Sequence, residues 1–218
     1  MMIPHEIMQK IGDCRLFIAR HGETVFNAAA RIQGEHVHTP LTIKGSIQAM
    51  QMGKALAAHI HNIENLALHA SDTGRALQTL ALISDEIGAD WHQHIADNRL
   101  REIDMGQWGG EYYRNLKDSL RVDSETGLFA TIAPDGESYS DIARRLIDWI
   151  AEQQFDRDML IISHGMTSRV LRGLLLGLDN LPHFNAPAAP SLPQGTMVLV
   201  QSGREEVINI ANGGAEIA

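Results

Sequence analysis

The stretch Arg-Leu-Phe-Ile-Ala-Arg-His-Gly-Glu-Thr, residues 15–24, decides the fold. Its first half is a short apolar run of the kind that forms a buried strand, and its second half turns polar at Arg20 and His21. Two later segments, residues 66–70 and 159–162, repeat this change from apolar to polar. Helical segments separate the three predicted strands, which favours parallel pairing with helices on both faces. The sequence therefore predicts an α/β domain built as a three-layer sandwich, in which a mostly parallel central sheet is flanked by helices.

The predicted helices follow these strands, and they cover residues 41–60, 75–87, 137–153 and 169–176. Thr42 is suited to cap the start of the first helix and Gly88 to end the second. Apolar side chains at helical spacing are expected to face the sheet: Ile43, Ile47, Met50 and Ala57 in the first helix, and Ile142, Leu146, Trp149 and Ile150 in the third.

The other segments are connections. Residues 92–100 should be extended, 101–110 should form a loop, 182–193 a proline-rich surface loop, and 196–201 with 206–211 a hairpin. Residues 111–136 are polar and irregular, which is typical of a lid that contacts substrate, although a purely structural connector has the same composition. A chain of this length suits one core, so residues 1–218 are expected to form a single domain with 111–136 as its lid.

Composition and charge narrow the class of protein. The 218 residues carry a formal net charge of -9, which argues against nucleic-acid binding because that needs a basic face. Cys14 is the single cysteine, so no disulfide can form within the chain and a reducing compartment is expected. The first residues lack the apolar core of a signal peptide, and no apolar stretch is long enough to span a bilayer. We therefore expect a cytoplasmic protein that binds neither nucleic acid nor membrane.

Charged and imidazole side chains gather where the predicted strands end. Arg20 and His21 follow the first strand, Arg75 lies one helical turn after the second, His164 follows the third, and a loop adds Glu102. Ligands of open α/β sheets bind at this edge. Guanidinium groups match phosphate oxygens, a neutral imidazole can attack phosphorus, and a carboxylic acid can protonate the leaving oxygen. The set predicts phosphoryl transfer in which cationic side chains, rather than a metal ion, stabilise the transition state.

At these positions the sequence resembles the histidine phosphatases, also called the phosphoglycerate mutase-like superfamily. The matching blocks occur in the family's order: Arg20 to Thr24 with Asn27, Pro40-Leu41-Thr42 with Gly45, Ser71-Asp72 with Arg75, Leu100 to Asp104 with Gly106, Gly136-Glu137-Ser138, and Ser163-His164-Gly165 with Arg169. One block alone would be weak support, whereas the ordered set spans most of the chain.

The resemblance implies a role for each matching residue. His21 is similar to the family's nucleophile, and Glu102 is similar to its proton donor. Arg20, Asn27, Arg75 and His164 resemble the phosphate pocket, and His164 also resembles a member of the catalytic set. The implied reaction is hydrolysis of a small phosphorylated substrate, a phosphate monoester, through a phosphohistidine on His21, without metal or cofactor.

Two other functions stay open. A cofactor-dependent phosphoglycerate mutase-like enzyme would return the phosphoryl group to product, although Arg101-Glu102-Ile103-Asp104-Met105-Gly106 is closer to the phosphatases. A non-catalytic regulatory or binding module of the same fold would be favoured by loss of a histidine or the acid, and all are present. Substrate choice is expected to come from the 31–38 loop and the 111–136 segment.

Several basic residues have simpler interpretations. The pairs His36 with His38, His59 with His61, and His92 with His94 lack the accompanying cysteines or carboxylates of a zinc site, so no metal site is predicted. Arg144 with Arg145, and Arg169 with Arg172, are expected to be solvated helix faces.

Overall fold

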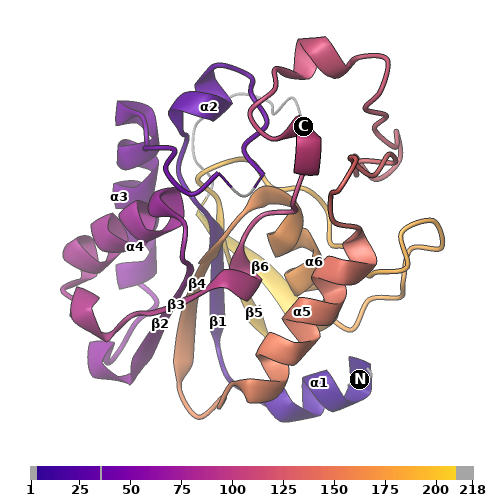
Figure 1. The fold of residues 1–218 in the computed structure, drawn as a ribbon. Helices are drawn as coiled ribbons and strands as arrows, with labels where there is room; N and C mark the ends of the chain where they lie inside the picture. Colours follow the sequence, from indigo (N-terminus) through magenta and orange to yellow (C-terminus); the bar gives the residue numbers. More distant parts are fainter. Residues whose placement is uncertain (1–3, 35, 210–218) are drawn as a thin grey trace.

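A six-stranded sheet forms the middle layer of the computed structural model, which describes residues 4–34 and 36–209 (Figure 1). The strands are β1 (Leu16–Arg20), β2 (Leu66–Ser71), β3 (Ile95–Asp97), β4 (Asp158–Ser163), β5 (Met197–Gln201) and β6 (Arg204–Asn209). They lie in the order β3-β2-β4-β1-β5-β6, in which the first four are parallel and the last two run antiparallel to their neighbours. The predicted mostly parallel sheet is confirmed, with an antiparallel hairpin at one edge.

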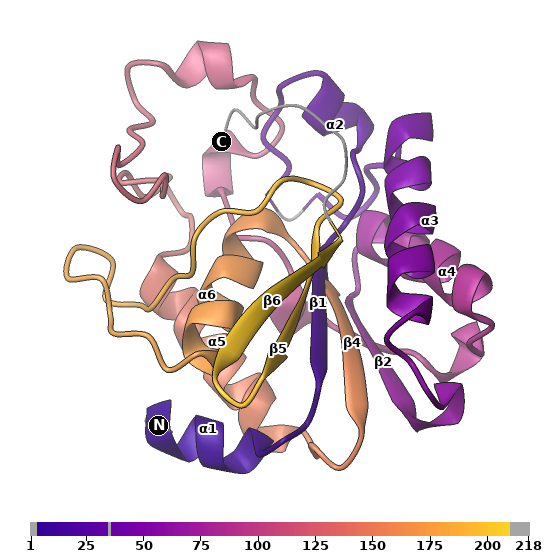
Figure 2. The ribbon, with the colours of Figure 1, turned by 180° about the vertical axis from the view of Figure 1, so that it is seen from behind.

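Helices cover both faces of this sheet, as Figures 1 and 2 show. One face carries α3 (Ile43–Ala57) and α4 (Gly74–Ile87), and the other carries α1 (Pro4–Ile11), α5 (Tyr139–Glu152) and α6 (Gly165–Leu175). The central strand β1 sends alternate side chains to the two cores, since Leu16 and Ile18 join one cluster and Phe17 and Ala19 the other. The predicted three-layer sandwich is confirmed.

Helix caps and helix starts differ in how well the sequence predicts them. The Thr42 hydroxyl accepts the Gly45 N–H at 3.0 Å, and Gly88 ends α4 at φ 72°, so both predicted caps are confirmed. The last predicted helix starts at Gly165 rather than at residue 169, because His164 is still extended and the chain turns helical directly after it. Helix α1 was not predicted at all, and its Ile7 and Ile11 side chains are buried.

Short turns replace part of the extended structure predicted for residues 92–100, where only β3 is a strand. The described 3-10 helices are η1 (Ile63–Asn65), η2 (Trp91–Gln93), η3 (Asn98–Leu100), η4 (Gly106–Trp108) and η5 (Tyr113–Leu116). The Asp90 and Asp97 carboxylates accept the N–H groups of His92 and Arg99, which stabilises turns on both sides of β3. The predicted hairpin is present, and its residues 210 and 211 lie outside the described residues.

The predicted apolar face of α3 is wrong. The four residues predicted to face the sheet are exposed: Ile43, Ile47, Met50 and Ala57. The buried residues are Gly45, Gln48, Ala49, Met52, Gly53 and Leu56. A Cβ added at Gly53 would lie 2.7 Å from the Cβ of Glu86 in α4, so this side must be small for the two helices to pack. In the third predicted helix, by contrast, the expected face of α5 is buried.

Three of the four arginines expected on solvated faces are held inside the structure, and only Arg144 is well exposed. Arg172 is 1% exposed and forms a two-pronged ion pair with Glu205, at 2.5 and 2.7 Å. Arg169 is 5% exposed and donates to the carbonyls of Ala189 and Thr126. Arg145 pairs with Glu137 at 2.7 Å. Sequence spacing cannot show these partners, because most of them come from distant segments.

The carboxyl ends of the parallel strands lie under two irregular segments, the short helix α2 (Val25–Ala28) and residues 111–136, which Figure 1 draws in pink. A β-bridge between Arg31 and Tyr112 joins the chain just after α2 to residues 111–136. Among the described residues, no helix has the length and apolar character needed to cross a membrane.

Candidate active site

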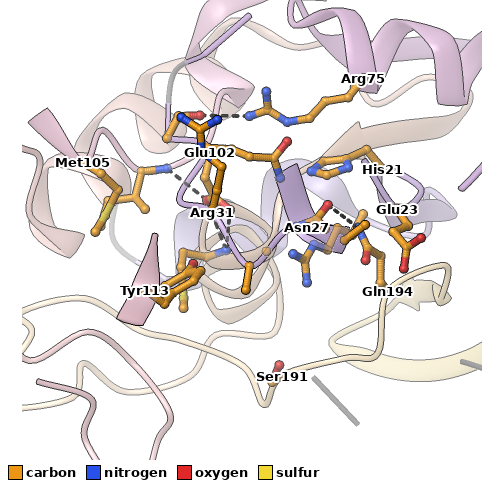
Figure 3. Close-up of a pocket in the computed structure, with 18 of the residues that line it drawn as sticks. His21, Glu23, Asn27, Arg31, Arg75, Glu102, Met105, Tyr113, Ser191 and Gln194 are labelled. Atoms are coloured by element: carbon orange, nitrogen blue, oxygen red, sulfur yellow. Dashed lines mark hydrogen bonds between the residues drawn. The ribbon is translucent and has the colours of Figure 1, made fainter. Parts of the chain in front are cut away.

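A cavity of about 450 Å³ opens at the carboxyl ends of the parallel strands (Figure 3). Five of the six predicted site residues line it: Arg20, His21, Asn27, Arg75 and Glu102. His164, the sixth, does not line the cavity. It is fully buried beside His21, with the two ring centroids 5.0 Å apart. The structure therefore brings all six residues together, five of them at the cavity and His164 against the ring of His21.

His21 is held in one tautomer by the backbone at the end of β1. Its Nδ1 lies 2.8 Å from the Gly22 carbonyl oxygen, which can only accept, so Nδ1 carries the proton and Nε2 keeps its lone pair. Burial lowers the pKa of His21 well below 6.5, and the charges of Arg75 and Arg20 lower it further, against the Gly22 hydrogen bond. A neutral imidazole with Nε2 available can attack phosphorus.

His164 lies between this imidazole and Arg75, with its ring against His21 and its Nδ1 against the guanidinium. Arg75 Nε donates to His164 Nδ1 at 3.2 Å, so the His164 proton is on Nε2, which lies 2.8 Å from Ser71 Oγ. Burial first, and then the charge of Arg75, lowers the pKa of His164 well below 6.5. His164 therefore stays neutral and fixes the orientation of the guanidinium group.

Arg75 is fully buried and largely committed to protein partners. Besides His164, it donates from Nη1 to the His36 carbonyl and, at 3.1 Å, to Thr39 Oγ1, and from Nη2 to the Gly34 carbonyl at 2.9 Å. The described residues thus occupy four of its five N–H groups. Burial lowers the pKa of Arg75 to about 10, so it remains a cation at neutral pH.

Glu102 lies at the start of α6, where backbone N–H groups converge on its carboxylate. Oε1 accepts from Ile103, Met166 and Thr167 at 2.9, 3.1 and 3.1 Å. Oε2 accepts from Met166 at 3.2 Å. A Cβ added at Gly165 would lie 3.3 Å from both Glu102 Oε2 and the central carbon of the Arg20 guanidinium, so Oε2 is on the side of Arg20. Oε2 is the oxygen better placed to exchange a proton with a ligand.

Asn27 faces the cavity from α2 and is fixed by its neighbours. Its Oδ1 accepts from Gln194 Nε2 at 2.9 Å, a contact drawn in Figure 3, and from the Thr24 N–H at 3.1 Å. Gln194 also lines the cavity and was not predicted, because the chain brings it there from a distant loop.

Several other lining residues were missed or only partly anticipated from the sequence. They include Glu23, Arg31, Lys44, Met105, Phe129 and Arg169. Arg31 lies over the Phe26 ring, 4.4 Å from its centroid, and over the Tyr112 ring at 5.1 Å, while its Nε donates to the Gly110 carbonyl at 2.7 Å. Arg31 falls inside the 31–38 loop expected to affect substrate choice. Glu23 and Lys44 form an ion pair at 2.8 Å beside the cavity.

The histidine pairs do not gather into a larger cluster. Within residues 4–34 and 36–209, no group of three or more His, Cys, Asp or Glu side chains is arranged to hold a metal ion. The side chains around the cavity that can bind an anion include arginines, a lysine, an asparagine and His21.

Two solved structures share this architecture. One is a mycobacterial glucosyl-3-phosphoglycerate phosphatase in complex with VO3, 26% identical, with a TM-score of 0.67 over 92% of this chain and 100% of that chain. The other is YhfR of Bacillus stearothermophilus, 27% identical, with a TM-score of 0.66 over 89% of this chain and 95% of that chain. Fold and strand order place the protein in the class of phosphoglycerate mutase-like α/β structures.

Sequence comparison gives the family. The profile of the histidine phosphatase superfamily (branch 1) matches residues 16–196. The probable phosphoglycerate mutase GpmB of Erwinia tasmaniensis is 34% identical over 174 residues, and that of an Enterobacter species is 36% identical over 176, each match covering 75% of both chains. The chain belongs to the histidine phosphatase superfamily, branch 1.

Proposed function

We propose that the protein hydrolyses a phosphate monoester through a phosphohistidine on Nε2 of His21. The observation that carries this proposal is the hydrogen bond from His21 Nδ1 to the Gly22 carbonyl, 2.8 Å long. It fixes the tautomer in which Nε2 is unprotonated, and His21 lines the cavity.

The reaction has two steps. In the first, Nε2 attacks phosphorus, the ester P–O bond breaks, and the leaving oxygen takes a proton from Glu102. In the second, the Glu102 carboxylate takes a proton from water, the water oxygen attacks phosphorus, and the P–N bond breaks to release inorganic phosphate. Arg20 and Arg75 stabilise the charge on the phosphoryl oxygens in both steps.

A mutase-type phosphoryl transfer is the second candidate. It is favoured by the names of the GpmB relatives, whereas the glucosyl-3-phosphoglycerate phosphatase complexed with VO3 favours hydrolysis. The two candidates share the phosphohistidine and differ in the acceptor. Phosphate release measured beside phosphoryl transfer to a phosphoglycerate separates them, and predominant transfer would favour the mutase.

The phosphohistidine is tested by rapid mixing with a labelled phosphate ester and an alkaline quench. We expect an acid-labile phosphoryl group on the wild-type protein and none on His21→Ala, which should also lose turnover. His92→Ala, at an exposed position, serves as the matched control and should keep both. A fully active His21→Ala variant would contradict the proposal.

Two inhibition experiments bear on the same chemistry. Orthovanadate should inhibit, since it mimics five-coordinate phosphorus between Nε2 and the leaving oxygen. Chelators should leave turnover unchanged, because the proposed transition state is stabilised by arginines; loss of activity in EDTA that Mg²⁺ or Zn²⁺ restores would argue for a metal-dependent reaction.

A further inference from the structure

Arg145 on α5 is a half-buried guanidinium whose three nitrogen atoms each donate to protein acceptors. Its Nε and Nη2 bind both oxygens of Glu137, at 2.7 and 3.0 Å. Nη1 donates to the Arg99 carbonyl, and Nη2 also lies 3.0 Å from the Arg101 carbonyl. Such a planar, two-pronged pair fixes position more strictly than a single contact does.

These contacts hold the backbone on both sides of Glu102. Arg145 binds the carbonyl of Arg101, the residue before Glu102. Glu137 binds Asp104, two residues after it, by accepting the Asp104 N–H at 3.3 Å and donating its own N–H to the Asp104 carbonyl at 2.9 Å. The ion pair thus anchors the segment that carries Glu102 at two points.

Thr167 links the same ion pair to the carboxylate. Its hydroxyl donates to the Arg101 carbonyl at 2.7 Å and lies 3.3 Å from Arg145 Nη2. Its backbone N–H donates to Glu102 Oε1 at 3.1 Å. The guanidinium, the segment before Glu102 and the start of α6 therefore form one hydrogen-bonded unit.

We infer that Arg145 is a positioning residue for the proton donor: with Glu137 and Thr167 it holds the Glu102 carboxylate where it can protonate the leaving oxygen. This inference rests on the proposed function, in which Glu102 is the general acid. Arg145 does not line the cavity, so it does not contact a bound ester directly. Its charge also lowers the pKa of His164, an effect that both esters in the test share. Small displacements of a proton donor are costly, because proton transfer needs hydrogen-bond distance to the leaving oxygen.

The test compares an alkyl phosphate with para-nitrophenyl phosphate. Nitrophenolate leaves without protonation, whereas an alkoxide does not, so loss of acid catalysis affects the alkyl ester selectively. Arg145→Met should slow the alkyl ester on the order of 10- to 100-fold and the nitrophenyl ester much less. Arg144→Met, the exposed neighbour paired only with Asp141, is the matched control and should change neither.

Glu102→Gln in the same assay distinguishes failure of the proposed acid role of Glu102 from failure of the positioning role of Arg145. If Glu102→Gln slows both esters equally, Glu102 is not the acid and the positioning role of Arg145 falls with it, while the phosphohistidine on His21 is decided separately by the His21→Ala experiment. If Glu102→Gln is selective for the alkyl ester but Arg145→Met slows both esters by one factor, only the positioning role falls.

The double variant gives a readout that a general loss of stability would not produce. If Arg145 acts through Glu102, adding Arg145→Met to Glu102→Gln should cost little further rate on the alkyl ester. Multiplication of the two losses would overturn the inference. Should Arg145→Met fail to fold, Thr167→Val removes the hydroxyl contacts with the Arg101 carbonyl, Arg145 and Glu102 Oε1. The same selective loss is expected relative to Thr167→Ser, and an equal loss on both esters would again overturn the inference.

Discussion

Gly22 and Gly45 bring the end of β1 and the start of α3 into backbone contact. A Cβ at Gly22 would lie 2.3 Å from the Gly45 carbonyl oxygen, and one at Gly45 would lie 2.0 Å from the carbonyl oxygen of Glu23. Gln48, one turn further along α3, accepts the Glu23 N–H at 2.8 Å. Because Gly22 is also the acceptor for His21 Nδ1, this contact fixes the imidazole as well as the helix.

Gly45→Ala should therefore lower both stability and activity. The added methyl group cannot fit without moving the His21–Glu23 backbone, and overpacking of this kind costs about 1–3 kcal/mol. Chemical denaturation and kcat/KM on one phosphate ester measure the two effects. Gln51→Ala, an exposed position on the same helix, should change neither. A Gly45→Ala variant as stable and active as the wild type would contradict this account.

At the scale of single residues, the candidate site residues were more predictable from the sequence than the packing partners of other side chains. His21, Arg75 and Glu102 could be predicted because their types and order carry a mechanism, and the structure places them around one cavity. Arg145 could not, since an arginine next to Arg144 on a helix reads as solvated. Its partners come from segments around Arg99 and Thr167 that the sequence does not show to be adjacent.

At the scale of elements, the 111–136 segment has an inner and an outer side. Tyr113 lines the cavity, and Figure 3 shows it at the end opposite His21. The next residue, Arg114, is exposed, lies 4.1 Å from the centroid of the Tyr112 ring, and does not line the cavity. The lid role is thus proposed for Tyr113 and not for Arg114.

Tyr113→Ala should change kcat/KM unequally across phosphate esters of different size, because the substituent beyond the phosphoryl group loses a contact. Hydrolysis of a small ester such as methyl phosphate should stay nearly constant. Arg114→Ala is the control from the same turn and should leave the ranking of substrates unchanged. If Tyr113→Ala scales every ester by one factor, the segment is a structural connector rather than a specificity lid.

The elements also show where periodicity misleads. In α5 the large apolar residues face the core, as their spacing predicts. In α3 the predicted residues Ile43, Ile47 and Met50 face solvent. The inner side carries Met52 and Leu56 together with glycines, which close approach to α4 and to the end of β1 requires. Hydrophobic spacing reports which face is apolar, but it cannot report how near the neighbouring backbone lies.

At the scale of the whole molecule, three buried histidines connect stability to pH. Burial lowers the pKa of His21 and His164 well below 6.5, and that of His69 to about 4. The unfolded chain binds protons at these sites near pH 6.5 and the folded protein does not, so the free energy of unfolding rises with pH in this range. The stabilisation that the neutral histidines contribute is fully present above pH 6.5 and is lost as the pH falls toward their pKa values in the folded protein.

Urea denaturation at pH 7.5, 6.5 and 5.5 measures this dependence. Between pH 6.5 and 5.5 we expect a loss of about 1 kcal/mol for each histidine, and a much smaller loss between 7.5 and 6.5. His69→Gln should reduce the slope by about a third, whereas His92→Ala, at an exposed site, should not. A free energy of unfolding that is constant from pH 6.5 to 5.5 would show that these side chains titrate normally.

The hydrogen bonds of Arg75 make ligand binding and loop anchoring compete. A bidentate grip on phosphate needs two N–H groups, and the described residues leave one uncommitted, so the second must be taken from one of the present acceptors, among them the carbonyls of Gly34 and His36. Occupancy of the cavity should then loosen the chain beside these carbonyls, and departure of inorganic phosphate should tighten it. Saturating phosphate would accelerate hydrogen exchange of the His36 amide while slowing it around His21. If Arg75 binds phosphate as proposed, a backbone carbonyl would replace each departing phosphate at the guanidinium, and the protein itself would assist product release.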